Sequence, residues 1–167
     1  MRISGRKAGL AGVLALLFAV VPVAAAGQAQ AVPLLPSFGS GHVYNGGSPR
    51  CLDSGTPTGA LLFNCSTSAY QQWVYNTRTG RFTGNSPTGC LDERAGTDGS
   101  RVFLNTCNGS ASQTWYGDPN GGTFVNAASG KCLDADLGTI GGQATIVQVY
   151  RCSGWSNQIW WFEFVSS

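Results

Sequence analysis

The chain repeats one pattern three times: Cys-Leu-Asp, then a second cysteine, then Gln-x-Trp. The first motif of each copy starts at Cys51, Cys90 and Cys132, and the Gln-x-Trp triplets are 71–73, 113–115 and 158–160. In every copy the Gln follows the second cysteine by six residues, whereas the spacing between the two cysteines lengthens from copy to copy. A fixed end with a loop of varying length is typical of a repeated structural unit with a variable surface loop.

Residues 1–31 have the pattern of a secretory signal peptide. The start is basic, residues 8–21 form an apolar run, and a small-residue stretch ends in an Ala-Gln-Ala triplet at 29–31. This order is typical of a cleaved signal, and the apolar run is short for a membrane-spanning helix. We expect cleavage after Ala31, with Ala26 as the alternative, and therefore a secreted, extracellular protein.

Removal of the signal leaves 136 of the 167 residues, which is the size of one domain. We expect residues 32–39 to be an N-terminal tail and residues 40–167 to be the domain. The chain has 10 Lys and Arg and 8 Asp and Glu, but three of the basic residues belong to the signal. The mature net charge is then −1, which argues against a nucleic-acid or acidic-membrane surface.

All six cysteines lie in the mature part of an exported chain, so disulfides are the first interpretation. Six cysteines allow 15 pairings, and the repeat selects the one that stays within each copy. The expected disulfides are Cys51–Cys65, Cys90–Cys107 and Cys132–Cys152. A zinc site is disfavoured, because the chain has one histidine and no Cys-x-x-Cys motif, and we expect no metal.

The composition and the short apolar runs predict an all-β fold. Runs with strand character precede the second cysteine of each copy, and another follows each Gln; they are 60–63, 101–104, 145–150, 73–75, 114–116 and 160–162. The three copies, of about four strands each, could close a core only together, around a pseudo-threefold axis. They span about residues 40–77, 78–117 and 118–165. We expect the repeated Leu and Trp inside the core, with each Gln hydrogen-bonded to backbone or to a neighbouring strand.

The triple motif resembles the ricin-type β-trefoil family, which includes the trefoil carbohydrate-binding modules of secreted bacterial glycosidases. The resemblance covers about residues 40–165. It implies a twelve-stranded trefoil with one shallow sugar site per copy. In such a site the family uses the Asp of Cys-Leu-Asp, an aromatic residue two positions before the second cysteine, and an Asn just before Gln-x-Trp.

The third copy has the complete set that the resemblance implies. Asp134 would accept hydrogen bonds from neighbouring sugar hydroxyls, and Tyr150 would pack against the apolar face of the sugar ring. Gln148, which lies on the same strand face as Tyr150, together with Asn157 and Gln158, would supply amides that fix the stereochemistry. We predict a sugar-binding site here.

The first copy has a partial set. Asp53 is present and Phe63 holds the aromatic position, but Tyr70 stands where the family has Asn. Tyr70 could offer a hydroxyl or a second stacking surface.

The second copy has the weakest set. Asp92 is present, but Asn105 holds the aromatic position and Ser112 replaces the Asn. Phe103 would lie on the same strand face, two residues before the family's position. We expect Asp92 to cap a turn through its backbone neighbours, with binding here the lesser alternative.

The sequence gives little support for an enzyme. His42 is the only histidine and no Gly-x-Ser-x-Gly motif occurs, while glycoside hydrolysis needs two carboxylates flanking one bond. We interpret Glu93, Asp98 and Asp136 as solvated loop charges near the sugar face, of which Asp136 could also touch a ligand. No cofactor motif is present, so we expect a protein without catalysis or cofactor.

We therefore expect a secreted, non-catalytic, lectin-like protein, acting as a monomer. Its partner would be a galactose-type glycan or a polysaccharide such as xylan. The alternative is an interaction or protease-inhibitor protein that uses the trefoil as a frame, because fold does not dictate function. In that case the variable loop at 136–142 would carry the contact.

Overall fold

The structure is a computed structural model and describes residues 40–55, 58–85 and 88–164. Each copy of the repeat contributes four strands. Copy 1 forms β1 (Gly41–Asn45), β2 (Ser48–Asp53), β3 (Leu61–Phe63) and β4 (Trp73–Asn76). Copy 2 forms β5 (Arg81–Asn85), β6 (Thr88–Glu93), β7 (Ser100–Asn105) and β8 (Trp115–Tyr116). Copy 3 forms β9 (Val125–Asn126), β10 (Cys132–Ala135), β11 (Thr145–Tyr150) and β12 (Trp160–Phe164). The predicted signal peptide and tail, residues 1–39, lie outside the described residues.

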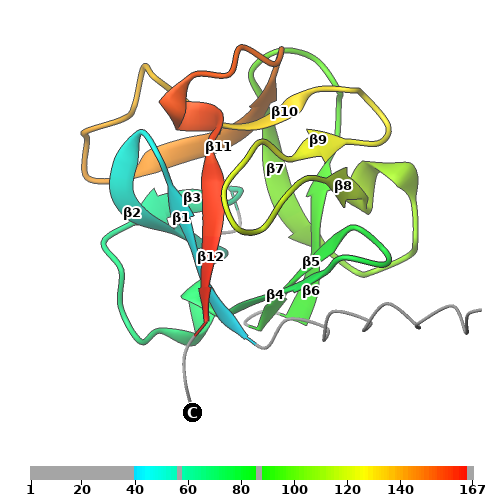
Figure 1. The fold of residues 1–167 in the computed structure, drawn as a ribbon, viewed down its shortest axis with the longest axis horizontal. Coiled ribbons are helices and arrows are strands. Elements are labelled where there is room, and N and C mark those ends of the chain that lie inside the picture. The colour runs from blue at the N-terminus through cyan, green and yellow to red at the C-terminus, as the bar shows by residue number, and fades with distance from the viewer. Residues whose placement is uncertain (1–39, 56–57, 86–87, 165–167) are drawn as a thin grey trace, which may run out of the picture. The chain divides into compact units, whose positions relative to one another are not determined.

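Strand pairing confirms the predicted trefoil. The last strand, β12, pairs antiparallel with β1 from Gly41 opposite Phe164 to Asn45 opposite Trp160, which joins the two ends of the domain (Figure 1). The strand β11 of copy 3 contacts both other copies, through β3 of copy 1 and β7 of copy 2. The three copies therefore form one body, because a single copy is too small to close a core of its own.

The helices in the described part of the chain are short 3-10 helices. They are η1 (Ala69–Gln71), η2 (Ala111–Gln113) and η3 (Ser156–Gln158), and each ends on the Gln of a Gln-x-Trp motif. No helix among the described residues has the length and apolar character needed to cross a membrane.

The repeated Leu and Trp residues form the centre of the core, as predicted. All six are fully buried; they are Leu52, Leu91, Leu133, Trp73, Trp115 and Trp160. Within each copy the indole Nε1 of the Trp donates to the backbone carbonyl of the Leu, at 2.8, 2.9 and 2.9 Å. Each buried indole N–H thus has a partner, as burial of a polar group requires, and the Gln-x-Trp segment is fixed to the Cys-Leu-Asp strand.

A second group of buried aromatic residues packs beneath these tryptophans and connects all three copies. Tyr75 and Phe82 lie 4.6 Å apart between ring centroids, and Phe82 lies 4.7 Å from Phe124. The Tyr75 hydroxyl donates to the carbonyl of Trp115 at 2.9 Å. Offset and edge-to-face rings of this kind add to the stability that burial alone provides.

Three disulfides join the cysteine pairs that the repeat predicts. Cys51–Cys65, Cys90–Cys107 and Cys132–Cys152 have Cα–Cα distances of 5.0, 5.0 and 5.1 Å. Each bond links the start of a Cys-Leu-Asp strand to the loop that leads into a 3-10 helix. No three His, Cys, Asp or Glu side chains in the described ranges lie close enough together to hold a metal ion.

Candidate functional site

In every copy the Asp of Cys-Leu-Asp accepts a hydrogen bond from the Gln of Gln-x-Trp. The three amide-to-carboxylate distances are 3.0 Å for Gln71 to Asp53, 3.0 Å for Gln113 to Asp92 and 2.8 Å for Gln158 to Asp134. All six side chains are buried. The Asp–Gln pair is therefore part of the scaffold of each copy, and an Asp alone does not define a sugar site.

The same Gln also holds the loop around the second cysteine. In copy 3, Gln158 Nε2 donates to the carbonyl of Arg151 at 2.9 Å, and its Oε1 accepts from the backbone N–H of Ser153 at 2.8 Å. Copies 1 and 2 have the equivalent bonds. The prediction that Gln bonds to backbone is confirmed, and Gln158 fixes the loop as well as the carboxylate.

Copy 3 adds two further amides to this arrangement. Asp134 accepts from Gln148 Nε2 at 3.0 Å on Oδ1 and from Asn157 Nδ2 at 2.9 Å on Oδ2, besides Gln158. Asp134 is 3% exposed. Burial raises the pKa of Asp134 above its ordinary value, the three amide bonds oppose this rise, and the nearby Asp136 adds to it.

The pairing of β10 with β11 explains why these side chains meet. Asp134 lies directly opposite Gln148, and Cys132 lies opposite Tyr150. Residues opposite each other in antiparallel strands share a face, and residues two apart on one strand do too. The carboxylate, the amide and the aromatic ring are therefore neighbours, while η3 brings Asn157 to the same place from the other side of the loop.

These side chains open into a pocket of about 460 Å³, which we call the Asp134 pocket. Its lining contains all five residues predicted for copy 3 and five others; it consists of Asp134, Asp136, Leu137, Gln148, Tyr150, Arg151, Ser153, Trp155, Asn157 and Gln158. Buried polar groups at the base and partly exposed apolar side chains at the wall are the usual composition of a small-molecule site.

The hydrogen bonds present leave defined places for a ligand. A carboxylate can accept about four hydrogen bonds, and Asp134 receives three, of which Oδ1 takes only one. Both N–H groups of Asn157 are used, because its Nδ2 also donates to the carbonyl of Ala135 at 3.0 Å. The Oδ1 of Asn157 is buried without a partner. Asn157 therefore orients Asp134, and two acceptors remain for hydroxyls, Asp134 Oδ1 and the unpartnered Oδ1 of Asn157.

Copy 1 lacks both additional amides. Leu61 lies opposite Asp53, where copy 3 has Gln148. Asp53 Oδ1 instead accepts from the backbone N–H of Gly55 at 2.7 Å. Tyr70 is 46% exposed, and a Cβ placed on Gly55 would lie 3.1 Å from Tyr70 Cγ. The Tyr70 ring thus lies over the turn after Asp53, while Phe63 lies opposite Cys51, at the position of Tyr150.

In copy 2 an amide side chain stands at the aromatic position and bonds the carboxylate. Asn105, at the aromatic position, donates to Asp92 Oδ2 at 3.1 Å. The structure thus gives Asp92 side-chain partners, Asn105 and Gln113, and the prediction of a backbone turn cap is wrong because cross-strand pairing brings an amide to the carboxylate. Phe103 lies opposite Asp92 as expected, with the Arg94 guanidinium 4.4 Å from its ring centroid.

The three acidic residues interpreted as solvated loop charges differ from one another. Glu93 is only 5% exposed and accepts from Ser129 Oγ at 2.8 Å, and burial raises its pKa; for Glu93 the prediction is wrong. Asp98 is exposed and bonds Lys131 at 2.7 Å. Asp136 accepts from the N–H of Gly138 at 3.0 Å and also lines the Asp134 pocket.

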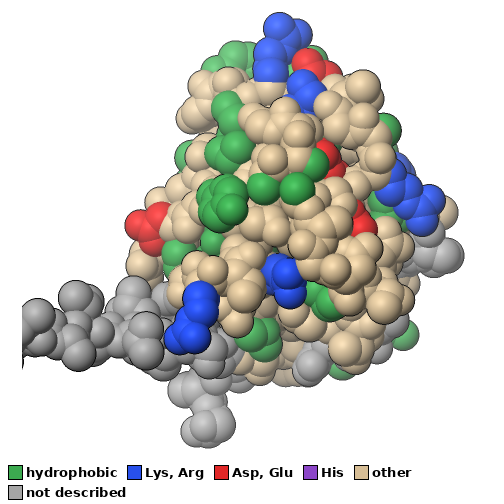
Figure 2. All heavy atoms as spheres, turned by 90° about the vertical axis from the view of Figure 1, so that its right-hand side faces the viewer, with side chains coloured by type: hydrophobic (Ala, Val, Ile, Leu, Met, Phe, Trp, Pro, Cys, Tyr) green, Lys and Arg blue, Asp and Glu red, His purple; other side chains and the backbone are tan. Residues whose placement is uncertain are grey.

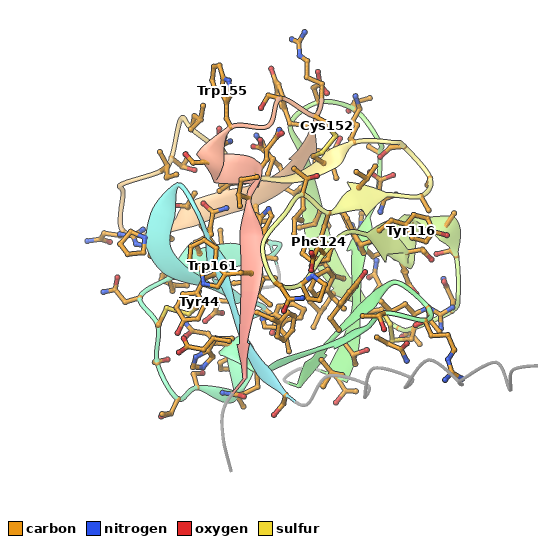
Figure 3. All side chains as sticks on the ribbon, in the orientation of Figure 1. Tyr44, Tyr116, Phe124, Cys152, Trp155 and Trp161 are labelled. Carbon is orange, nitrogen blue, oxygen red and sulfur yellow. A yellow bond between two sulfur atoms is a disulfide. The ribbon has the colours of Figure 1, made fainter. Side chains whose placement is uncertain are left out.

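Trp155 is one of the pocket residues that the sequence analysis missed, together with Arg151 and Ser153. Trp155 is 63% exposed and projects from the loop between Cys152 and η3 (Figure 3). A signal for it exists in the repeat, because the position three residues after the second cysteine is Ser68 in copy 1 and Ser110 in copy 2. A large aromatic residue where the other copies have serine indicates a role beyond the scaffold.

The chain belongs to the ricin-type beta-trefoil lectin domain family, whose model matches residues 39–160. The fold is also similar to that of the designed three-fold symmetric protein ThreeFoil, with a TM-score of 0.67, 22% identity and coverage of 75% of this chain and 99% of that one. The search of curated proteins found no significant match.

Two further similar structures belong to longer proteins. The hemolytic lectin CEL-III gives a TM-score of 0.64 at 25% identity, with 77% of this chain and 31% of that chain covered. An exo-beta-1,3-galactanase from Clostridium thermocellum gives 0.65 at 23% identity, with 78% and 31% covered. This chain thus spans about a third of either protein, so similarity to the galactanase carries no evidence of catalysis.

We expect acidity to affect stability and sugar binding in opposite directions through Asp134. Because its pKa is raised in the folded state, the folded chain binds this proton more tightly than the unfolded chain. The resulting stabilisation is present below the unfolded value of about 4 and is lost as pH rises through the folded pKa. Binding, which uses the ionised carboxylate as acceptor, should increase over the same window.

Thermal unfolding and sugar titration across this pH window would check the prediction, with Asp134→Asn as the variant that cannot titrate. The difference in unfolding free energy between the parent and this variant, followed across pH, gives the contribution of Asp134 titration to stability. Because burial also raises the pKa of Glu93, Glu93→Gln serves as the control. A parent and Asp134→Asn with parallel pH profiles would contradict the assignment.

Proposed function

We propose that this chain is a secreted, non-catalytic carbohydrate-binding protein whose main site is the Asp134 pocket. The observation that carries this proposal is the convergence of three amides on one buried carboxylate, beside the Tyr150 ring, at the base of an open pocket. A fixed acceptor of this kind favours vicinal hydroxyls, and an adjacent ring favours the apolar face of a pyranose. Membership of the lectin family supports the same conclusion.

The state of the two pocket carboxylates supports binding over catalysis. Asp134 is held as an acceptor by three amides. Asp136 accepts from the N–H of Gly138 and from the Thr139 hydroxyl at 3.0 Å. Glycoside hydrolysis would require one of them to donate a proton to a leaving group and the other to act across the same bond. Instead, both carboxylates accept hydrogen bonds from the protein's own donors.

A galactose-type sugar, or a polysaccharide such as xylan, is the proposed ligand. The similarity to an exo-beta-1,3-galactanase supports a galactose-containing glycan, and the similarity to a hemolytic lectin supports sugar binding in general. A single shallow site should bind with a dissociation constant of about millimolar to tens of micromolar. If copy 1 also binds through Phe63 and Tyr70, two sites on one rigid body would raise the avidity for a polymer.

Export and a monomeric state belong to the same proposal. The signal pattern at residues 1–31 and the three disulfides fit an oxidising, extracellular environment. Acidic and basic side chains are scattered singly or in small groups on the face shown in Figure 2. That distribution gives no support to a nucleic-acid partner.

The structure weakens the case for the alternative, an interaction protein acting through the loop at 136–142. The loop is closed on itself by bonds from Gly138 and Thr139 to Asp136, and the Thr139 hydroxyl accepts from the N–H of Ile146 at 2.9 Å. It also places Leu137 in the wall of the Asp134 pocket. Deletion of this loop should therefore weaken sugar binding as well.

We expect Tyr150→Ala to lower the affinity for the sugar about tenfold, because it removes an aromatic contact worth roughly 1.4 kcal/mol. Tyr150 is only partly buried, so its loss should change the unfolding free energy by less than the loss of a core aromatic residue. Binding of the parent and the variant to a glycan array, followed by calorimetric titration with the best ligand, would measure the effect.

Phe63→Ala is the matched variant in copy 1, because Phe63 holds the position that Tyr150 holds in copy 3. The proposal predicts the larger loss for Tyr150→Ala. Unchanged binding in Tyr150→Ala together with a loss in Phe63→Ala would move the main site to copy 1. A parent chain that binds no glycan would contradict the proposal as a whole.

A further inference from the structure

The wall of the Asp134 pocket carries two apolar side chains that are exposed to solvent. Trp155 is 63% exposed and Leu137 is 50% exposed, and both line the pocket. Trp155 extends outward at the edge of the domain (Figure 3). Side chains of this size gain stability from burial, so their exposure at a pocket wall indicates a surface that a ligand covers.

The fold does not need the indole ring of Trp155. The contacts that fix this loop use the backbone, since the N–H of Trp155 donates to Ser153 Oγ at 3.3 Å and its carbonyl accepts from Gln158 N at 2.9 Å. The other two copies build the same loop with Ser68 and Ser110 at this position. The ring can therefore be assigned to recognition rather than to folding.

The polar groups at the base of the pocket lie around one carboxylate and suit one sugar residue. The acceptors that remain there are Asp134 Oδ1 and Asn157 Oδ1, and Tyr150 provides one ring in the same pocket. The volume of about 460 Å³ is within the range of roughly 300–1,000 Å³ that holds drug-sized ligands. Drug-sized ligands are larger than a single pyranose. The pocket thus has space and apolar surface beyond what a monosaccharide would use.

We propose that Trp155, together with Leu137, forms a second sugar subsite next to the Asp134 subsite. The site would then recognise a glycan of at least two linked residues, the first held by Asp134 and Tyr150 and the second stacked through its apolar C–H face on the indole of Trp155. This inference rests on the proposed carbohydrate function and specifies its ligand class as an oligosaccharide.

Calorimetric titration with matched sugar series tests the subsite. The probes are galactose with β-1,3-galactobiose, and xylose with xylobiose. The parent should bind one disaccharide about tenfold more tightly than its monosaccharide, which corresponds to one aromatic contact. Trp155→Ala should remove this gain, bringing the disaccharide affinity to the monosaccharide value, and Trp155→Phe should restore part of it.

Tyr116→Ala is the matched control. Tyr116 is also 63% exposed but lies on β8, far from Trp155 in Figure 3, so this variant should keep the disaccharide gain. If Trp155→Ala keeps the gain, or if the parent binds both members of each series equally, the subsite is refuted while sugar binding stands. If the parent binds no member of either series, the proposed function and the subsite both fail.

Discussion

Asp134→Ala is expected to remove measurable sugar binding. The substitution deletes the acceptor at the base of the pocket and releases three amides from the geometry that Asp134 imposes. Loss of hydrogen bonds to a charged group should lower the binding free energy by about 3 kcal/mol, which is roughly 100-fold in affinity. From a starting affinity in the micromolar to millimolar range, calorimetric titration should detect no binding.

The same variant should also be less stable than the parent, by about 2 kcal/mol, because buried amide N–H groups lose their partner. Asn157 and Gln158 keep their bonds to the carbonyls of Ala135 and Arg151, so the domain should still fold. A cooperative thermal transition would establish this before binding is compared.

Asp92→Ala is the counterpart in copy 2. It removes the acceptor of Gln113 and Asn105, a similar structural change in a copy that has no aromatic residue at the Tyr150 position. We expect a comparable loss of stability with sugar binding retained. If Asp92→Ala weakens sugar binding as much as Asp134→Ala does, the loss of stability and not the pocket would explain the effect of Asp134→Ala.

Reduction of the three disulfides is expected to unfold the mature domain. Each bond closes a loop of 14, 17 or 20 residues, worth about 3 kcal/mol in the chain-entropy description. Three such contributions approach the total stability of about 5–15 kcal/mol that is usual for a domain. Near-ultraviolet circular dichroism should lose its tertiary signal in the reduced chain at room temperature, and sugar binding should disappear with it.

Removal of one disulfide at a time separates an effect on the sugar site from an effect on the scaffold. Serine substitution of Cys132 and Cys152 frees the strand end that carries Tyr150 and the loop that leads to Asn157, whereas substitution of Cys90 and Cys107 changes copy 2 alone. Both pairs should lower the stability by a similar amount, but the first should weaken sugar binding more in molecules that remain folded. A reduced chain that keeps a cooperative transition would contradict this account.

The parts of the fold that recur three times could be predicted from the sequence. Cysteine pairing, the buried Leu and Trp, and the backbone bonds of Gln follow from comparison of the copies, since a residue required at the same place three times has a structural reason. The constellation of Asp134, Gln148, Tyr150 and Asn157 could be selected because the resemblance to the ricin-type family implies these positions and the other copies lack parts of the set. The structure brings these four residues into one pocket.

The features that sequence comparison missed depend on contacts between segments distant in the chain. Glu93 is buried because Ser129, from the next copy, provides a hydrogen bond to it. Asp92 bonds Asn105 because β6 and β7 pair in a particular register. Trp155 becomes a pocket residue only through the path of the loop between Cys152 and η3. The contacts of Glu93 and Asp92 have no periodic signal in the sequence, whereas Trp155 differs from the serines of the other two copies.

The location of the bound sugar is the most direct test of the proposed site. A two-dimensional ¹H–¹⁵N NMR titration with the best glycan-array ligand observes the side-chain amides of all three copies at once. The account predicts shifts for the amides of Gln148, Asn157 and Gln158 and for the Trp155 indole N–H, with Gln113 unchanged. Shifts confined to Gln71 or Gln113, or no shifts at saturating sugar, would contradict it.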